Sequence, residues 1–265
     1  MIFDTHAHYD DEQFDEDREK LLSMLTEQGI VGVVDVGSTV LSLEKALELA
    51  HAHDFIYAAL GLHPDEIGNL TEDVLHYIEK NLSDPKVVAV GEIGLDYYWH
   101  KEAREIQERK FRAQIQLALD HEKPIIVHSR EAAEDTLRII RDYYAGGKMA
   151  NPGIIHCFSY SAEMAELYVK MGFYLGIGGV VTYKNARKLK EVVERIPLEH
   201  LVLETDCPYL TPTPNRGKRN SSLNLPYVVS EIASLKGMAP EEVEGVTEAN
   251  ARTVFNLQGR RERSL

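Results

Sequence analysis

Cysteine is scarce in this sequence, since Cys157 and Cys207 are the only two in 265 residues. Two cysteines cannot form the disulfide framework of a small secreted domain, and a low cysteine content is typical of a reducing compartment. Long apolar runs are also absent, because no stretch approaches the ~20 apolar residues that span a membrane. The first residues, MIFDTHAHYDDEQ, lack the basic start and apolar segment of a secretory signal. We therefore expect a cytoplasmic protein with no membrane association and no obligate protein partner.

Basic residues are in deficit: 29 Lys and Arg stand against 43 Asp and Glu, a formal net charge of −14. This deficit argues against a nucleic-acid substrate, because proteins that neutralise phosphates carry basic surfaces. Bound divalent cations would weaken the argument, since they supply positive charge and the carboxylates that hold them are counted in the total. One basic cluster, Arg216-Gly-Lys218-Arg219, lies in a proline-rich segment shortly after Asp206. A solvated loop and a phosphate contact are equally good interpretations of this cluster.

The chain has no low-complexity block, linker-like stretch or break in composition, which indicates one domain over residues 1–258 with a polar tail at 259–265. Within it, short apolar runs typical of strands alternate with patterns typical of helices. The strand-like runs are 2–6, 32–36, 55–60, 87–91, 125–128, 154–156, 173–177 and 201–204. The helical patterns are 15–28, 42–53, 71–81, 103–121, 132–144, 162–171, 186–196, 225–236 and 240–256. Eight strands that alternate with helices predict an α/β fold, a parallel (β/α)8 TIM barrel.

Histidines and carboxylates recur at the ends of the strand-like runs. His6 and His8 stand two residues apart, and in an extended segment residues at this spacing project to the same side and can bind one ion. In a TIM barrel the carboxyl ends of all strands meet at one mouth, where active sites lie. The same mouth would receive Glu92, His128, His156 and Asp206, and also His63. The pattern therefore predicts one metal site built by several strands.

The ligand types limit the metal. Four imidazoles and two carboxylates suit Zn, Mn, Fe, Co or Ni better than Mg, which prefers a cage of oxygens. The absence of cysteine ligands argues against a structural zinc site. A second His-x-His pair, His51 and His53, ends a helical pattern, where residues two apart point to different sides and cannot share an ion. Each cysteine directly follows a proposed ligand, so in a strand it would face away from the site, toward the surrounding helices.

Six short motifs resemble one known family. They are DTHAH at 4–8, GLHP at 61–64, GEIGLDY at 91–97, IVHSR at 126–130, IHCF at 155–158 and ETDCPYLTP at 204–212. From Phe3 to about Asn256 the chain resembles the TatD family of metal-dependent deoxyribonucleases, within the amidohydrolase superfamily. The resemblance implies a distorted TIM barrel in which two divalent ions (Zn, Mn, Mg, Fe, Co or Ni) activate a water that hydrolyses DNA phosphodiesters from 3′ ends.

The resemblance also implies roles for single residues. One metal ion would be surrounded by His6, His8, Glu92 and Asp206. A second ion would be held by His128 and His156 and bridged to the first by Glu92. Asp206 would also orient or deprotonate the attacking water, and His63 would contact the phosphate or assist the leaving group. A structural histidine held by hydrogen bonds is an equally good interpretation of His63.

Other polar residues are candidates for supporting roles. Strand parity places Asp4 and Glu204 on the same faces as the ligands, where each would accept a hydrogen bond from a metal-bound histidine or pair with a buried Lys or Arg. Asp96 would contact the substrate or fix its own loop. Further substrate contacts are expected from Arg130, Arg216, Lys218 and Arg219. The adjacent aromatic residues, Tyr97, Tyr98 and Trp99, would stack on bases or pack against the barrel rim.

Three classes of function are compatible with the sequence. A 3′-to-5′ deoxyribonuclease should present cationic groups at the mouth, such as Arg130, Lys184, Arg216 and Lys218. A small-molecule amidohydrolase should instead enclose its pocket, and the same ligands also serve ester hydrolases such as D-aminoacyl-tRNA deacylases. A metal-binding partner protein without catalysis is the third class. It is disfavoured because a cluster of such ligands is electrostatically costly to assemble for no ion.

Overall fold

Eight parallel strands form the centre of the protein and pair in sequence order. The structure, a computed structural model, describes residues 1–99, 103–146, 149 and 151–257, so the predicted tail at 259–265 lies outside the described residues. The strands are β1 (Ile2–Ala7), β2 (Ile30–Gly37), β3 (Ile56–Leu60), β4 (Val87–Asp96), β5 (Ile125–Arg130), β6 (Gly153–Ile155), β7 (Tyr174–Ile177) and β8 (Leu201–Leu203). One isolated bridge, Ala7 to Cys207, joins the first strand to the segment after the last. The predicted distorted TIM barrel is confirmed.

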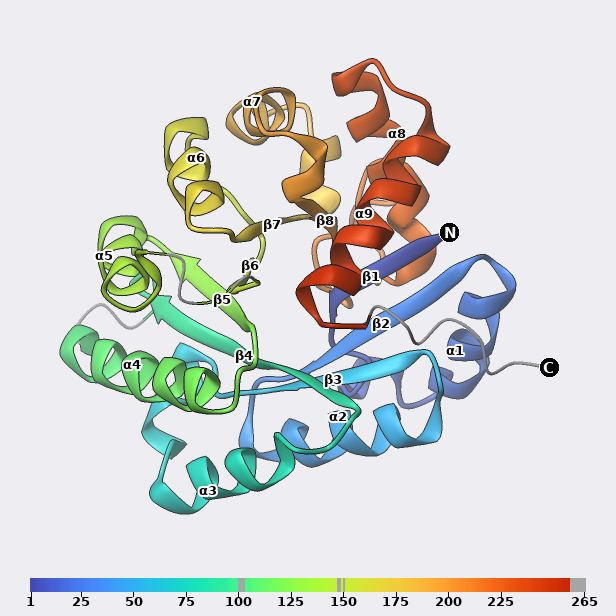
Figure 1. Cartoon of the computed structure of the whole chain (residues 1–265). Helices are drawn as coiled ribbons and strands as arrows, with labels where there is room; N and C mark the ends of the chain where they lie inside the picture. The colour runs from blue at the N-terminus through green and yellow to red at the C-terminus, as the bar shows by residue number, and fades with distance from the viewer. Residues whose placement is uncertain (100–102, 147–148, 150, 258–265) are drawn as a thin grey trace.

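Helices alternate with the strands and lie around the barrel (Figure 1). The α-helices are α1 (Arg18–Glu27), α2 (Val40–Ala52), α3 (Glu72–Asn81), α4 (Arg104–Asp120), α5 (Ala133–Tyr144), α6 (Ala162–Lys170), α7 (Arg187–Arg195), α8 (Leu225–Lys236) and α9 (Pro240–Val254). Short 3-10 helices are η1 (Glu12–Phe14), η2 (Pro64–Asn69), η4 (Gly179–Thr182), η5 (Leu198–His200) and η6 (Ser222–Asn224). Each predicted helical range overlaps one α-helix. In the described ranges, no helix is long and apolar enough to cross a membrane.

Strand β4 is longer than the sequence predicts, because it continues from Val87 through Glu92 to Asp96. Its pairing with β5 is irregular after Val90 and resumes as far as Asp96. Gly94 makes this continuation possible: its φ is +154°, and a Cβ there would lie 1.9 Å from the carbonyl oxygen of His128. Gly94 therefore allows close pairing with β5 beyond residue 91, where the predicted run ends. As a result Glu92 lies inside β4 and Asp96 is its last residue.

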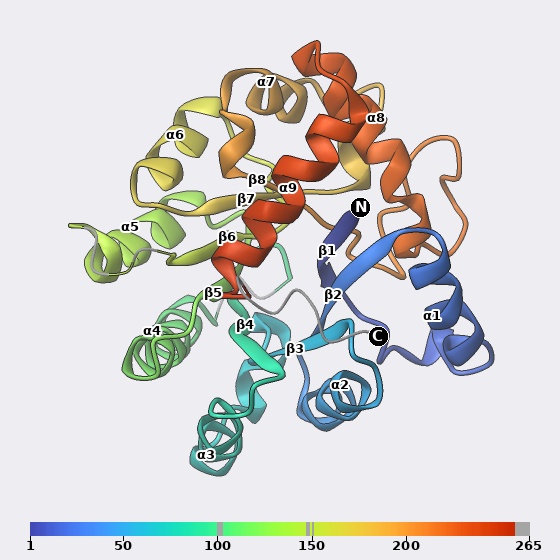
Figure 2. The same ribbon diagram turned by 45° about the vertical axis from the view of Figure 1, so that its right-hand side comes forward.

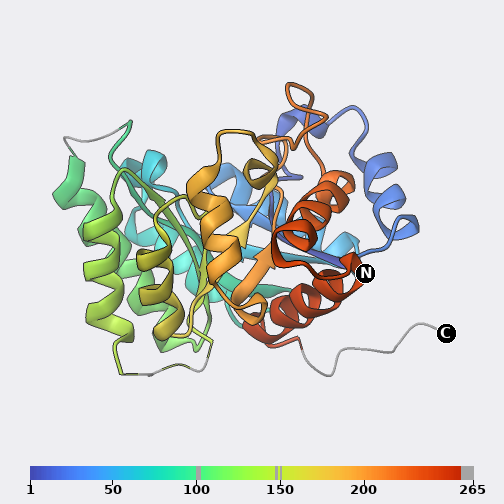
Figure 3. The same ribbon diagram turned by 90° about the horizontal axis from the view of Figure 1, so that it is seen from above.

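Apolar side chains fill the end of the barrel where the strands begin. Phe3, near the start of β1, stacks on Tyr57 and Phe255, with ring centroids 6.2 Å away in both pairs. Helix α9, which precedes Phe255, lies across this end (Figure 2). In Figure 3 the segment after β1 and the loop after β8 lie at the opposite end. The carboxyl ends of the strands are thereby left for polar residues, as in other TIM barrels.

The seam between β1 and β8 is held by the side chain of Asp4, which is fully buried. Its Oδ1 accepts from the backbone N–H of Thr205 at 3.0 Å, and its Oδ2 accepts from the Thr205 hydroxyl at 2.7 Å. The hydroxyl of Ser222 donates to the same Oδ2 at 2.6 Å. Three hydrogen bonds from two later segments therefore converge on one carboxylate of β1.

Replacing Asp4 with Ala should destabilise the protein by about 3 kcal/mol or more, because several buried donors would each lose an acceptor. Urea unfolding followed by circular dichroism measures this change. Ser230→Ala is the matched control, since within the described residues that exposed hydroxyl bonds only the carbonyl of Pro226 in its own helix. Equal unfolding midpoints for the two variants would show that Asp4 does not hold the seam.

Candidate metal centre

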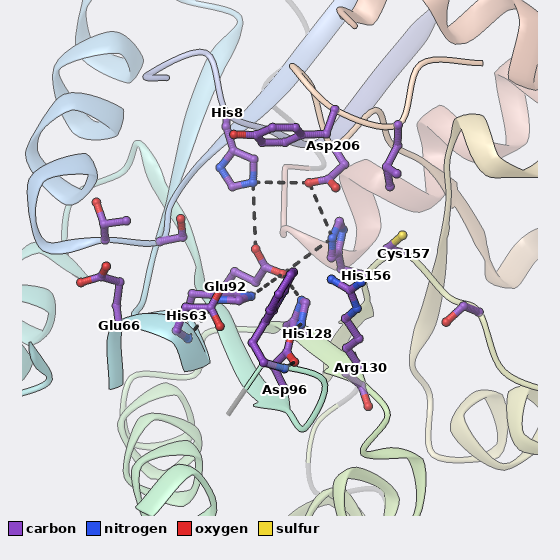
Figure 4. Close-up of a pocket in the computed structure, with 18 of the residues that line it drawn as sticks. His8, His63, Glu66, Glu92, Asp96, His128, Arg130, His156, Cys157 and Asp206 are labelled. Carbon is purple, nitrogen blue, oxygen red and sulfur yellow. Dashed lines mark hydrogen bonds and ion pairs between the residues drawn. The ribbon is translucent and has the colours of Figure 1, made fainter. Parts of the chain in front are cut away.

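Six side chains from five parts of the barrel converge at the carboxyl ends of the strands. Five of them line a pocket of about 900 Å³ (Figure 4), and the sixth, His6, is buried. The six are the predicted ligands His6, His8, Glu92, His128, His156 and Asp206. Ligand atoms from overlapping sets of three, such as His6, His8 and Glu92, lie within 4.8 Å of one another. Residues separated by 200 positions in the chain thus form one cluster, as the strand pattern predicts.

His6 and His8 point the same way from the end of β1, and their Nε2 atoms are 3.1 Å apart. The other nitrogen of His8, Nδ1, lies 2.9 Å from the carbonyl oxygen of Val36. A carbonyl oxygen only accepts, so Nδ1 carries the proton and a neutral His8 ring has a bare lone pair at Nε2. Two imidazole nitrogens held this close need a proton or a metal ion between them. The pair therefore fits a cation.

Glu92 lies between two groups of imidazoles. Its Oε2 lies 3.4 Å from His6 Nε2 and 4.0 Å from His8 Nε2. Its Oε1 lies 2.8 Å from His128 Nδ1 and 3.7 Å from His156 Nε2. Burial disfavours the charge of Glu92, but His156 and His6 outweigh burial and hold its pKa well below the usual value. One carboxylate thus presents a separate oxygen to each group.

Asp206 completes the cluster from the segment after β8. Its Oδ1 lies 3.5 Å from His8 Nε2 and 3.8 Å from the Nε2 atoms of both His6 and His156. Asp206 has a left-handed backbone with φ of 55°, a conformation that Asp adopts more readily than most residues. Its N–H donates to the carbonyl of His6 at 2.9 Å. The turn after β8 is therefore fixed against β1, which brings this carboxylate to the histidines.

Two buried carboxylates orient the remaining histidines. Glu204 Oε2 lies 3.1 Å from His156 Nδ1, and Asp96 Oδ2 lies 3.1 Å from His128 Nε2. Each contact places a proton on the outer nitrogen, so that the inner nitrogen, which faces Glu92, can bind an ion once it has lost its own proton. The predicted hydrogen bond between Glu204 and a histidine of the cluster is present. Asp96 fixes its own loop as well, since its Oδ1 accepts from the N–H groups that follow it at Tyr98 and Trp99.

The corresponding expectation for Asp4 is wrong. Its carboxylate binds Thr205 and Ser222 rather than an imidazole ring, a Lys or an Arg. The outer nitrogen of His6, Nδ1, has no hydrogen-bond partner within the described ranges. Asp4 has the parity of His6 but lies one step deeper along β1, where hydroxyl and amide donors reach it first.

The comparisons with known proteins agree with this geometry. Residues 3–256 match the family model described as TatD related DNase. The chain belongs to the TatD family. It is 46% identical over 257 residues to the uncharacterized metal-dependent hydrolase YabD of Bacillus subtilis, covering 97% of this chain and 100% of the relative. It is 32% identical to the 3′-5′ ssDNA/RNA exonuclease TatD of Pantoea vagans, with 97% and 100% covered. The crystal structure of YjjV, a TatD homologue from Escherichia coli, superposes with a TM-score of 0.90 at 30% identity, covering 96% of this chain and 98% of that one.

The protein is therefore a metal-dependent hydrolase of the TatD family.

His63 lies beside the cluster of predicted ligands. Its Nδ1 accepts from the N–H of Asp65 at 3.1 Å, so the ring proton belongs on Nε2, 4.0 Å from Glu92 Oε1. Burial, and secondarily His128, lower the pKa of His63 to about 4. The ring is neutral at neutral pH and presents an N–H to the pocket. This geometry suits a hydrogen-bond donor to the substrate, one of its two predicted roles.

The predicted substrate residues separate into two groups. Arg130 lines the pocket and lies over the ring of Tyr98, 4.1 Å from the centroid, and near Trp99 at 5.7 Å. The loop after β8 lies farther out: Arg216 lies over Tyr183, and Arg219 pairs with Asp17 at 2.6 Å. Neither arginine of this loop, nor Lys218, lines the pocket. Among the three adjacent aromatic residues, Tyr97 is buried, whereas Tyr98 and Trp99 are 50% and 59% exposed.

The alternative histidine pair lies away from the cluster. His51 binds Asp84 at 2.8 Å, and His53 lies 3.5 Å from Glu19, so the two rings have separate partners. This arrangement is the one that their helical spacing predicts.

The expectation that both cysteines face the helices holds for Cys207 alone, which is buried in the core. Cys157 instead lines the pocket next to His156 (Figure 4). Strand β6 ends at Ile155 and Cys157 has φ of 45°, so strand alternation no longer applies there. Burial raises the pKa of the Cys157 thiol well above its usual value.

Several pocket residues have no place in the sequence-based prediction. Ser38 and Thr39 follow β2, and Asp65 and Glu66 follow β3, and all four line the pocket. Two further carboxylates, Asp10 and Asp35, lie buried near His8, and burial raises both of their pKa values. The signal for Asp35 is a charged residue inside the apolar run GVVDVG, at the end of a strand.

Three of the ligand histidines have raised pKa values. Burial by itself lowers each pKa, but the neighbouring carboxylates outweigh it. The pKa is raised to about 10 in His8 and His156 and to about 9 in His128. Burial and the nearby His156 lower the pKa of His6. Without metal ions, the rings of His8, His128 and His156 are therefore protonated on both nitrogens and positively charged at neutral pH.

Glu92→Gln should weaken the binding of every ion in the cluster, because the substitution keeps the size of the side chain but removes the charge shared by both groups. Elemental analysis and titration with Zn²⁺ or Mn²⁺ measure the change. His51→Ala is the control, since that ring binds Asp84 on the surface. Undiminished metal content in Glu92→Gln would show that Glu92 does not join the two groups.

Metal binding should release protons and become tighter as the pH rises from about 6 to about 9, because a histidine must lose its proton before it binds an ion. The sign follows from the raised pKa values of His8, His128 and His156, which keep these rings protonated until the pH exceeds about 9. Calorimetry in buffers of different ionisation enthalpy counts the protons. Binding without proton release at neutral pH would contradict these pKa shifts.

Proposed function

We propose that this TatD-family hydrolase is a two-metal phosphodiesterase that removes nucleotides from the 3′ ends of DNA. The observation that carries the proposal is the content of one pocket, in which Arg130 and the exposed ring of Trp99 lie beside the carboxylate and imidazole cluster. A cation and an aromatic surface suit a phosphate and a base. The printed name of the Pantoea vagans relative, a 3′-5′ ssDNA/RNA exonuclease, supports the same substrate class.

The donor set fits two divalent ions. His6 and His8 with Asp206 would hold one, His128 with His156 the other, and Glu92 would bind both because its two oxygens face the two groups. Ions bound there supply Lewis acidity toward a phosphoryl oxygen and lower the pKa of a nearby water. The pocket is open, and the side chains of Trp99 and Tyr209 in its lining are 59% and 53% exposed. Such a pocket suits a nucleic-acid strand better than a small molecule that must be enclosed.

The residues of the chain then handle the protons of hydrolysis. A water oxygen bonds to phosphorus, and the bond from phosphorus to the sugar oxygen breaks. Asp206, whose pKa is lowered by its histidine neighbours against the effect of burial, is ionised and able to accept a proton from the water. His63 presents its Nε2–H to a phosphate oxygen or the departing sugar oxygen, and the sugar oxygen takes up a proton from solvent water. A neutral donor suits this role because it stabilises developing charge without adding a cation.

The proposal is tested by a metal titration with four substrates: single-stranded DNA, DNA with an abasic site, RNA and a D-aminoacyl-tRNA. Release of nucleotides from 3′ ends of DNA, dependent on added metal, is the expected result. Release of D-amino acids without cleavage of nucleic acid would instead assign the site to an ester hydrolase. No reaction with any of the four would favour a binding protein.

Arg130→Gln should weaken the binding of an oligonucleotide. The slope of the logarithm of the binding constant against the logarithm of the salt concentration should become shallower by about one released counterion, because one phosphate contact is lost. Turnover of bis(p-nitrophenyl) phosphate should fall less, because this small diester does not extend beyond the metal ligands. Arg219→Gln is the informative comparison, as Arg219 is held by Asp17. If Arg219 also contacts a phosphate, the slope of binding against salt concentration will become shallower by the same amount in both variants. Equal losses on both substrates for Arg130→Gln would mean that Arg130 supports the structure of the site.

A further inference from the structure

The pocket has two chemically different walls. One wall comes from the segments after β2 and β3 and contains Ser38, Thr39, Asp65 and Glu66. The other comes from the ends of β4 and β5 and contains Trp99 and Arg130. In Figure 4, Glu66 and Arg130 lie on opposite sides of the ligand cluster. A polyanion placed across the cluster would therefore meet opposite charges at its two sides.

The acidic wall is held rigidly. Asn69 donates to Glu66 Oε2 at 2.6 Å, which fixes this carboxylate within η2. The backbone N–H of Asp65 donates to His63 Nδ1 at 3.1 Å, which fixes the start of η2 against this ring. In the same wall, Thr39 caps helix α2 by accepting from the N–H of Ser42. The Ser38 hydroxyl and the second oxygen of Glu66 bind no other group in the part of the chain that the structure describes, so both can contact a substrate.

The opposite wall suits the continuing chain. Among the described residues that line the pocket, Arg130 is the one with a permanent positive charge. Stacking on Tyr98 at 4.1 Å holds its guanidinium in place without neutralising it. Trp99 and Tyr209 add exposed aromatic rings at the rim. Phosphates and bases are therefore favoured on this side and phosphates are disfavoured on the other.

We infer that Glu66, with Ser38, determines which chain ends the site accepts: a terminal nucleotide with a free 3′-hydroxyl, and not one with a 3′-phosphate. A hydroxyl donates a hydrogen bond to a carboxylate, whereas a phosphate dianion beside Glu66 is repelled. The same wall prevents the chain from continuing past the cluster, which restricts cleavage to ends. This inference rests on the proposed phosphodiesterase function and adds to it the residues that select the end.

The test uses one 5′-labelled oligonucleotide in two forms, with a 3′-hydroxyl or a 3′-phosphate, and a circular single strand of the same composition. For the metal-loaded wild type, kcat/KM should favour the 3′-hydroxyl by at least about tenfold, because a like-charge contact separates the two ends. The circle should remain intact. Glu66→Gln should bring the two kcat/KM values close together, chiefly by increasing turnover of the phosphorylated end.

Glu72→Gln is the matched control, since it makes the same change in the first turn of α3 outside the pocket and should keep the wild-type preference. Metal content and the circular dichroism spectrum establish that both variants are folded and loaded. Equal use of both ends by the wild type, or an unchanged preference in Glu66→Gln, would overturn the inference while leaving the phosphodiesterase function in place. Failure to hydrolyse any of the oligonucleotides and also bis(p-nitrophenyl) phosphate would overturn both.

Discussion

The buried charge of Glu92 is the constraint on which the mouth of the barrel depends. A carboxylate that is 4% exposed is stable only with positive charge or donors around it, and five imidazoles have a nitrogen within 4.0 Å of its two oxygens. Neutral imidazoles do not balance that charge, so protons or metal ions must. The outer carboxylates Asp96 and Glu204 then decide which imidazole nitrogens stay bare. The arrangement as a whole therefore favours a cation over an anion at the mouth.

Strand periodicity was enough to predict which residues reach the mouth, because the parity of an extended segment and the common direction of parallel strands are local properties. His6 and His8 show this directly. The partners of Asp4 and the orientation of Cys157 were not predictable in the same way. The first depends on which donors pack above a residue in three dimensions, and the second on a positive φ just beyond a strand. The length of β4 was missed because the predicted apolar run ends at Gly91, whereas the strand continues past it to Asp96 with close pairing at Gly94.

Barrel closure and ligand geometry share one set of contacts. The seam between β1 and β8 contains one isolated bridge and a few backbone hydrogen bonds, such as the one from the N–H of Asp206 to the carbonyl of His6. The side chain of Asp4 adds its hydrogen bonds to Thr205, and these contacts lie within two residues of a predicted metal ligand. Because regular strand pairing ends with β8 at Leu203, the backbone that follows is free to turn. That turn is what brings Asp206 to the histidines of β1.

The charge distribution explains how an acidic protein could act on a polyanion. A net charge of −14 opposes long-range attraction, and several surface arginines are already paired, such as Arg195 with Glu163 and Glu166. Screening limits any remaining attraction between exposed charges to about 8 Å at physiological salt. In the proposed function, recognition would therefore occur inside the pocket, through Arg130, the exposed rings and the ions that the cluster would hold. Because such contacts act at short range, the walls of the pocket would decide which part of a chain can reach the cluster, and an acidic wall on one side would exclude a phosphate that a basic surface would attract.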